Sequence, residues 1–196
     1  MTATAPCIVA IGASWGGLKA MRTLLAGLPA DLGASVVVVQ HRSADSSGPA
    51  YVELLQKVCK LPIIEIDDKE RIVPDTVFVA PADYHTLIET GHFALSRDIR
   101  VQYARPSIDV LFESAADAYG DEVLAVVLTG ANQDGADGVL CVKRAGGYTI
   151  VQDPETSERP EMPRAAIGTG VVDEVLTLDE VAPRIVALCT NGKVRP

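Results

Sequence analysis

Cysteine and histidine are scarce in this sequence, and the few that occur are widely separated. The cysteines form no C-x-x-C pair, and with only three histidines no group has the spacing of zinc ligands. We therefore predict no metal site, and we interpret the cysteines as small apolar side chains of a protein from a reducing compartment. The cysteines are Cys7, Cys59, Cys141 and Cys189, and the histidines are His41, His85 and His92.

Long apolar runs and an excess of basic residues are also missing. No stretch approaches the roughly 18 apolar residues of a membrane-spanning helix, and residues 1–6 lack the basic start and apolar core of a signal peptide. The 17 Lys and Arg residues are outnumbered by 26 Asp and Glu residues, which gives a net charge of −9. We therefore expect neither membrane insertion nor nucleic-acid binding, and we predict a cytoplasmic location.

The apolar pattern favours an α/β fold. The 196 residues are enough for one large domain, and short β-branched runs alternate with longer segments of helical spacing. Four consecutive valines in the segment 35–40 suit a strand that is covered on both faces. We predict a single doubly wound domain over residues 1–196, with a mostly parallel sheet and an antiparallel edge hairpin. The expected strands are 7–11, 35–40, 61–66, 76–79, 86–89, 93–96, 124–128 and 148–151, and the expected helices are 18–28, 49–60, 107–118, 136–144, 163–167 and 178–189.

Three polar residues follow the ends of three strong predicted strands. Ser14 comes after strand 7–11, His41 after strand 35–40, and Asp134 after strand 124–128. Ligands of open parallel sheets bind beyond the carboxyl ends of the strands, so we expect these side chains at one edge of the sheet. A serine, a histidine and an aspartate supply the nucleophile, the base and the orienting carboxylate of a serine hydrolase.

The sequence around Ser14 supports the role of nucleophile. Gly12-Ala13-Ser14-Trp15-Gly16 fits G-x-S-x-G, a sharp strand-to-helix turn that exposes a hydroxyl. A helix that begins near Gly16 would direct free N–H groups at a developing oxyanion. Two alternatives stay open: Ser14 acts only as a helix cap, or the glycines form a phosphate loop, for which the usual spacing and lysine are absent.

His41 and Asp134 also have structural alternatives. A polar residue after an apolar strand often only marks the edge of the sheet, and an aspartate before glycine is a common turn or cap residue. We interpret His85 and His92 as surface residues beside the hairpin, and we place Asp137 inside a helix, facing away from the strand end. The order serine, histidine, aspartate differs from that of α/β-hydrolases, in which the histidine comes last.

Several segments resemble the CheB-type receptor methylesterases, and they follow that family's order from about residue 8 to residue 186. They are Ile11-Gly12-Ala13-Ser14 with Gly16-Gly17; Val37-Val38-Val39-Gln40-His41; Val79-Ala80-Pro81; residues 105–112; Leu128-Thr129-Gly130 with Asp134-Gly135; Ala145-Gly146-Gly147; Gln152-Asp153; residues 162–166; and residues 172–176.

The resemblance implies a function. Such enzymes hydrolyse glutamate methyl esters on the cytoplasmic domain of chemotaxis receptors, release methanol, and in many cases deamidate glutamines there. Their catalytic serine, histidine and aspartate map onto Ser14, His41 and Asp134, and no metal or cofactor is implied. The expected partner is a methylated receptor or a related signalling protein. Family members commonly carry an N-terminal receiver domain, and none is encoded here. Two alternatives stay open: a free-standing member, for which a receiver domain in trans is a further partner, or an excised domain.

Three departures from the family pattern concern the substrate. Trp15 replaces the usual threonine, Ala131-Asn132 replaces Met-Gly, and Glu161 replaces the glycine before Met162. We expect Trp15, Ala131 and Met162 to line the oxyanion or substrate pocket. A hydrolase of small esters or amides and a catalytically silent receptor-binding module remain alternative functions, although a silent module has no need of all three catalytic residues.

Overall fold

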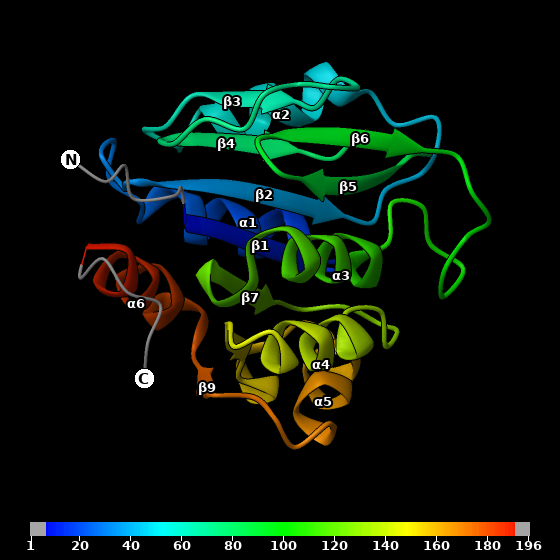
Figure 1. Ribbon diagram of the computed structural model, residues 1–196. Helices are drawn as coiled ribbons and strands as arrows, with labels where there is room; N and C mark the ends of the chain where they lie inside the picture. The colour runs from blue at the N-terminus through cyan, green and yellow to red at the C-terminus, as the bar shows by residue number, and fades with distance from the viewer. Residues whose placement is uncertain (1–6, 191–196) are drawn as a thin grey trace.

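The computed structural model describes residues 7–190 and is built on a seven-stranded, fully parallel sheet (Figure 1). The strands are β1 (Cys7–Ala13), β2 (Ala34–Gln40), β3 (Ile63–Glu65), β4 (Thr76–Val79), β5 (His85–Glu89), β6 (His92–Ser96), β7 (Val123–Val127), β8 (Tyr148–Gln152) and β9 (Glu174–Leu176). The helices are α1 (Gly17–Ala26), α2 (Gly48–Gln56), α3 (Ile108–Tyr119), α4 (Ala136–Arg144), α5 (Glu161–Gly168) and α6 (Leu178–Thr190).

The side of the sheet on which new strands are added changes between β1 and β7. The strand order is β3-β4-β2-β1-β7-β8-β9, so β2, β3 and β4 lie on one side of β1, and β7, β8 and β9 lie on the other. The loops that follow β1 and β7 therefore diverge at this point. In parallel α/β sheets, such a switch point is where ligands bind.

Two apolar cores cover the two faces of the sheet, as a doubly wound fold requires. One core packs against α1, α2 and α6, and the other against α3, α4 and α5. The valines of β2 alternate between them: Val36 and Val38 belong to the first core, and Val37 and Val39 to the second. The prediction of a strand that is buried on both faces is confirmed.

The predicted antiparallel hairpin is present as β5–β6 and forms a separate two-stranded sheet. Its apolar side chains Ile88 and Phe93 belong to the core beneath α3. The ring of Phe93 lies 4.9 Å from that of Phe78 in β4, and the N–H of Ile88 donates to Ser114 of α3 at 3.0 Å. The hairpin therefore packs against α3 and against the face of the sheet that α3 covers.

Strand β9 was not expected from the sequence. It has only three residues, and it is defined by its parallel pairing with β8, in the register Ile150 to Glu174. Within residues 7–190, no helix is long and apolar enough to cross a membrane, and no group of side chains could hold a metal ion. The segment 1–6, interpreted above as lacking a signal peptide, lies outside the described residues.

Candidate active site

The register of the parallel strands brings the three candidate segments together. Strand β1 lies between β2 and β7, and Ala13 is paired with Gln40. Beyond these ends, the N–H of His41 donates to the carbonyl of Ala13 at 3.0 Å, and the N–H of Ser14 donates to the carbonyl of Thr129 at 2.9 Å. Ser14 is therefore flanked by His41 on one side and by the loop after β7 on the other.

Glycines and a buried glutamine shape the turn that carries Ser14. Gly16 has a φ of 77°, in the left-handed region that favours glycine. Gly17 begins α1, and its N–H donates to the carbonyl of Ser14 at 2.9 Å. The Gln40 amide donates to the same carbonyl at 2.6 Å and lies so close that a Cβ atom at Gly17 would come within 2.0 Å of Gln40 Oε1.

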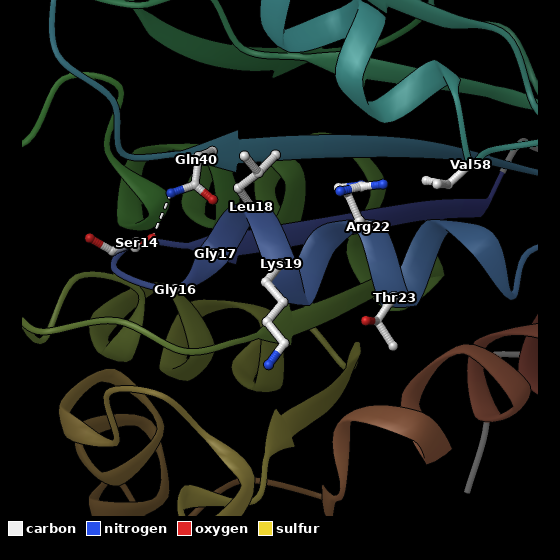
Figure 2. Close-up of a pocket in the computed structure, with 9 residues that line it drawn as sticks. All are labelled: Ser14, Gly16, Gly17, Leu18, Lys19, Arg22, Thr23, Gln40 and Val58. Atoms are coloured by element: carbon white, nitrogen blue, oxygen red, sulfur yellow. Dashed lines mark hydrogen bonds between the residues drawn. The ribbon is translucent and has the colours of Figure 1, made fainter.

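The hydroxyl of Ser14 is available for chemistry. Figure 2 shows it pointing away from Gln40, and it makes no hydrogen bond to any residue of the described chain. The residue at the N-cap of α1 is Gly16, which has no side-chain cap. The alternative that Ser14 serves as a helix cap is therefore wrong.

A fully buried carboxylate holds the imidazole of His41. Nε2 of His41 lies 2.7 Å from Oδ2 of Asp134, and the Asp134 side chain has no solvent exposure. Oδ2 also accepts the N–H of Ile108 at 2.8 Å, while Oδ1 accepts the Ser107 hydroxyl at 2.8 Å and the N–H of Asp109 at 3.0 Å. These groups form the N-terminus of α3, where a helix favours negative charge.

These hydrogen bonds keep Asp134 ionised. Burial acts to raise the pKa of its carboxyl group, but the hydrogen bond from His41, the N–H groups of Asp109 and Ile108, and the charge of His41 outweigh burial, so the pKa is lowered from its ordinary value. An anionic Asp134 can orient the imidazole and stabilise the imidazolium that forms during catalysis.

The contacts of the ring indicate which nitrogen of His41 is available as a base. Nε2 carries the proton that is donated to Asp134, and the Asn132 amide lies 3.4 Å from Nδ1. The Asn132 amide is itself oriented because its Oδ1 accepts the N–H of Asp134 at 3.2 Å. The lone pair is therefore on Nδ1, where it accepts the long hydrogen bond from the Asn132 amide, whereas chymotrypsin-like enzymes direct Nδ1–H at the aspartate. Among residues 7–190 the ring has no hydrogen bond to Ser14, and in substrate-free enzymes such bonds are often long and tighten with substrate.

Comparisons with known proteins identify the family of this chain. The family model for CheB methylesterase matches residues 9–185. The chain belongs to the CheB methylesterase family. A Cupriavidus metallidurans protein named protein-glutamate methylesterase/protein-glutamine glutaminase 2 is 40% identical over 98% of this chain and 57% of its own length. A Leptospira interrogans protein whose name gives the same two activities is 46% identical over 94% of this chain and 95% of its own.

The fold is also that of a solved family member. The crystal structure of the Thermotoga maritima CheB methylesterase catalytic domain matches with a TM-score of 0.89 and 31% identity, over 94% of this chain and 99% of that one. The α/β fold predicted from the sequence is therefore confirmed.

In this CheB-family chain, Asp109 is a site residue that the sequence reasoning missed. It is buried, and its Oδ1 accepts the N–H groups of Gly135 and Gly138 at 2.8 Å each, at the start of α4. Burial, with a smaller effect from the charge of Asp134, raises its pKa from 3.8 to about 7. An aspartate in the first turn of a predicted helix is a known capping signal, but the sequence did not show that Asp109 caps a different helix.

Two of the three expected pocket residues reach the surface of the site. Trp15 is 59% exposed, and its indole N–H donates to Glu158 at 3.0 Å, while the guanidinium of Arg159 lies 5.4 Å from the ring centre. Ala131 is exposed in the loop before Asp134. Within the described part of the chain, the backbone N–H groups of Trp15 and Ala131 have no acceptor.

Met162 has a different position. It is only 1% exposed and packs in the core, and its N–H donates to the carbonyl of Gly130 at 2.9 Å. A Cβ atom at Gly130 would lie 1.9 Å from the sulfur of Met162 and 2.9 Å from Cβ of Ser14. Met162 therefore packs closely against Gly130, which in turn contacts Ser14.

The remaining titratable candidates lie outside the catalytic group. The interpretation of His85 as a surface residue is wrong: it is 2% exposed, its Nδ1 accepts the N–H of Ser107 at 3.2 Å, and its Nε2 donates to Ile99 at 3.1 Å. His85 is buried because the hairpin packs beside the start of α3. The side chain of His92 is 35% exposed and pairs with an acidic neighbour. Asp137 is exposed in the first turn of α4, as expected.

Proposed function

We propose that this chain is a protein-glutamate methylesterase that uses Ser14, His41 and Asp134 to hydrolyse glutamate methyl esters. The observation that carries the proposal is the buried Asp134 carboxylate, which holds Nε2 of His41 at 2.7 Å beside the turn that exposes Ser14. Membership of the CheB methylesterase family and the names of its relatives support the reaction. Those names support a protein-glutamine glutaminase activity as a second reaction of the same site.

The first half of the reaction forms an acyl-enzyme. Nδ1 of His41 takes the proton of the Ser14 hydroxyl as the oxygen attacks the ester carbonyl carbon, and the carbonyl becomes an oxyanion. Asp134 stabilises the imidazolium that results. When the carbonyl re-forms, the bond to the methoxy group breaks, and His41 returns its proton to that oxygen, so methanol leaves.

The second half regenerates the enzyme. A water molecule loses a proton to Nδ1 of His41 and attacks the acyl carbon, and the second tetrahedral intermediate collapses with Ser14 as the leaving group. His41 protonates the serine oxygen, and the product is a glutamic acid side chain, which loses its proton to solvent to become a carboxylate. No electron is gained or lost, so the reaction needs no redox cofactor.

The oxyanion needs hydrogen-bond donors that are free before substrate binds. We propose the backbone N–H groups of Trp15 and Ala131, because each lies beside Ser14 or in the neighbouring loop and has no acceptor in residues 7–190. The residue after the nucleophile commonly provides one such donor. Loss of one oxyanion donor typically lowers kcat by about 10²–10³. Met162 supports this pocket indirectly, because it packs against Gly130, which contacts Ser14.

The proposed substrate is a methylated glutamate on the cytoplasmic domain of a chemotaxis receptor or of a related signalling protein. This proposal rests on the family and on the activities that the names of the relatives give. We therefore also propose a cytoplasmic location for the enzyme. A receiver domain that acts in trans is a further proposed partner, which rests on the family resemblance alone.

The test is methanol release from methylated chemoreceptor membranes, with wild type compared to Ser14→Ala. We expect release by wild type only. If neither protein releases methanol but a fluorophosphonate still labels Ser14 in wild type, the chain is a hydrolase of another ester. If Ser14 is not labelled either, the chain is a silent binding module.

A further inference from the structure

The groove beside Ser14 carries positive charge. It encloses about 620 Å³ and is lined by Lys19 and Arg22 of α1, together with Ser14 and Gln40. Figure 2 shows both side chains projecting from α1, and both residues are exposed. Neither makes an ion pair with another residue of the described chain, and no acidic residue lines the groove.

Basic residues also line the pocket on the other side of the catalytic pair, but each is paired with a carboxylate outside the lining: Arg42 with Glu65 at 3.5 Å, and Arg100 and Arg105 with Asp83 at 3.6 and 2.7 Å. This pocket encloses about 590 Å³, and His41 lines it together with Arg42, Arg100 and Arg105. Again no aspartate or glutamate is among the lining residues. The chain as a whole has a net charge of −9, so the absence of acidic residues from both grooves is a local departure from its composition.

Tyr103 is the most exposed large apolar residue of this region. It lines the pocket of His41 and is 95% exposed. It lies in a two-residue turn closed by hydrogen bonds of 3.2 and 2.8 Å between Val101 and Ala104. Both central residues are left-handed, with φ of 48° at Gln102 and 63° at Tyr103. Asn and Gly are the residues that favour this turn, so a tyrosine is conformationally unfavourable here.

The loop that carries Tyr103 is held in place. The Arg105 guanidinium donates to the carbonyls of Arg97 and Asp98 at 2.8 and 2.9 Å, and to Asp83 at 2.7 Å. Arg100 lies 3.6 Å from the same Asp83 carboxylate. The aromatic ring is therefore presented to solvent from an ordered loop at the edge of the catalytic pocket, which is the arrangement of a binding contact.

We propose that the segment carrying the esterified glutamate is an acidic polypeptide that binds across both grooves. Its carboxylates lie beside Lys19 and Arg22 on the α1 side, and it contacts Tyr103 and Arg100 on the other side of His41. This proposal rests on the proposed function. Hydrolysis of a glutamate ester and of a glutamine amide each leave a carboxylate, so a segment with several such sites becomes more negative with every turnover.

The experiment compares two activities of each variant: methanol release from methylated receptor membranes, and hydrolysis of p-nitrophenyl acetate, a small neutral ester. The measured quantity is the ratio of the two kcat/KM values. We expect Lys19→Glu with Arg22→Glu to lower this ratio at least tenfold, mainly through the KM for receptor. The matched control is Arg71→Glu with Arg144→Glu, which changes the net charge equally at exposed positions that line neither groove, and it should keep the ratio within twofold.

A second variant separates binding from folding. Tyr103→Asn removes the ring but places a residue that tolerates the left-handed turn, so its Tm should equal or exceed that of wild type. We expect the ratio to fall about fivefold. Raising NaCl should also raise the receptor KM of wild type more steeply than that of the Lys19/Arg22 variant, because ions screen the cations.

The outcomes distinguish the two proposals. If wild type releases methanol and both variants keep its ratio, the acidic docking surface is wrong and the methylesterase function stands. If the control lowers the ratio as much as the Lys19/Arg22 variant, total charge governs binding and the proposed surface is also wrong. Absence of methanol release by wild type would overturn both proposals.

Discussion

Asp134 and Asp109 exchange helix caps: Asp134 caps α3, which contains Asp109, and Asp109 caps α4, which follows Asp134. Asp134, just before α4, accepts the N–H groups of Ile108 and Asp109 at the start of α3. Asp109, in α3, accepts the N–H groups of Gly135 and Gly138 at the start of α4. The exchange fixes the triad carboxylate to two helices at once, so the position of His41 depends on a residue that contacts neither substrate nor imidazole.

Asp109→Ala should therefore weaken both the fold and the reaction. Two buried N–H groups lose their acceptor, which should lower the free energy of unfolding by about 1–3 kcal/mol, and the loop of Asp134 loses its support, which should lower kcat. Asp109→Asn keeps an acceptor oxygen and should restore most of the stability and activity. Urea unfolding and small-ester kinetics measure both effects. Equal losses in the Ala and Asn variants would show that the charge, rather than the hydrogen bonds, is what matters.

The pH dependence of stability should carry the signature of Asp109. Its pKa is raised from 3.8 to about 7 by burial, so the folded protein binds this proton more tightly than the unfolded chain does. The free energy of unfolding should then fall as pH rises from about 4 to about 7 and level off above. Asp134, whose pKa is lowered, acts in the opposite sense and only below about pH 4, where its stabilisation is lost. Urea unfolding at several pH values should give a flatter profile for Asp109→Asn, and parallel profiles would contradict the assignment.

The proximity of the three proposed catalytic residues could be predicted from the sequence because each residue follows a strong strand. The apolar runs before Ser14, His41 and Asp134 identify the strands, and a parallel sheet brings their ends together. Asp109 and His85 could not be assigned in this way. Their roles depend on how α3 meets α4 and the hairpin, which is contact between segments distant in sequence. The three-residue strand β9 was missed for the same reason, since its pairing with β8 defines it.

The contact between Gly130 and Met162 should tolerate no added methyl group. A Cβ atom at Gly130 would lie 1.9 Å from the sulfur of Met162 and 2.9 Å from Cβ of Ser14. Gly130→Ala should therefore lower the free energy of unfolding by about 1–3 kcal/mol and lower kcat by displacing the nucleophile. Gly168→Ala is the matched control, because a Cβ atom there meets nothing within 4 Å at the end of α5. Thermal unfolding and ester hydrolysis of the two variants should differ clearly, and a fully active Gly130→Ala enzyme would show that the Ser14 turn shifts freely.

Asp134→Asn tests the carboxylate itself. The carboxylate accepts hydrogen bonds from Ser107, Ile108 and Asp109 as well as from His41, so an amide –NH₂ would face at least one donor whichever way it is turned. The buried mismatch should lower the free energy of unfolding by about 1–3 kcal/mol.

The same substitution should stop the His41 ring from being held as the Nε2–H tautomer, with a fall in kcat of about 10⁴, as in other triads. Asp137→Asn changes an exposed aspartate three residues further on, in the first turn of α4, and it should shift stability by no more than about 0.5 kcal/mol and leave turnover intact. Comparable activity of the two variants would remove Asp134 from the mechanism. A loss of activity by Asp134→Asn without any loss of stability would instead show that α3 can be capped by Ser107 alone.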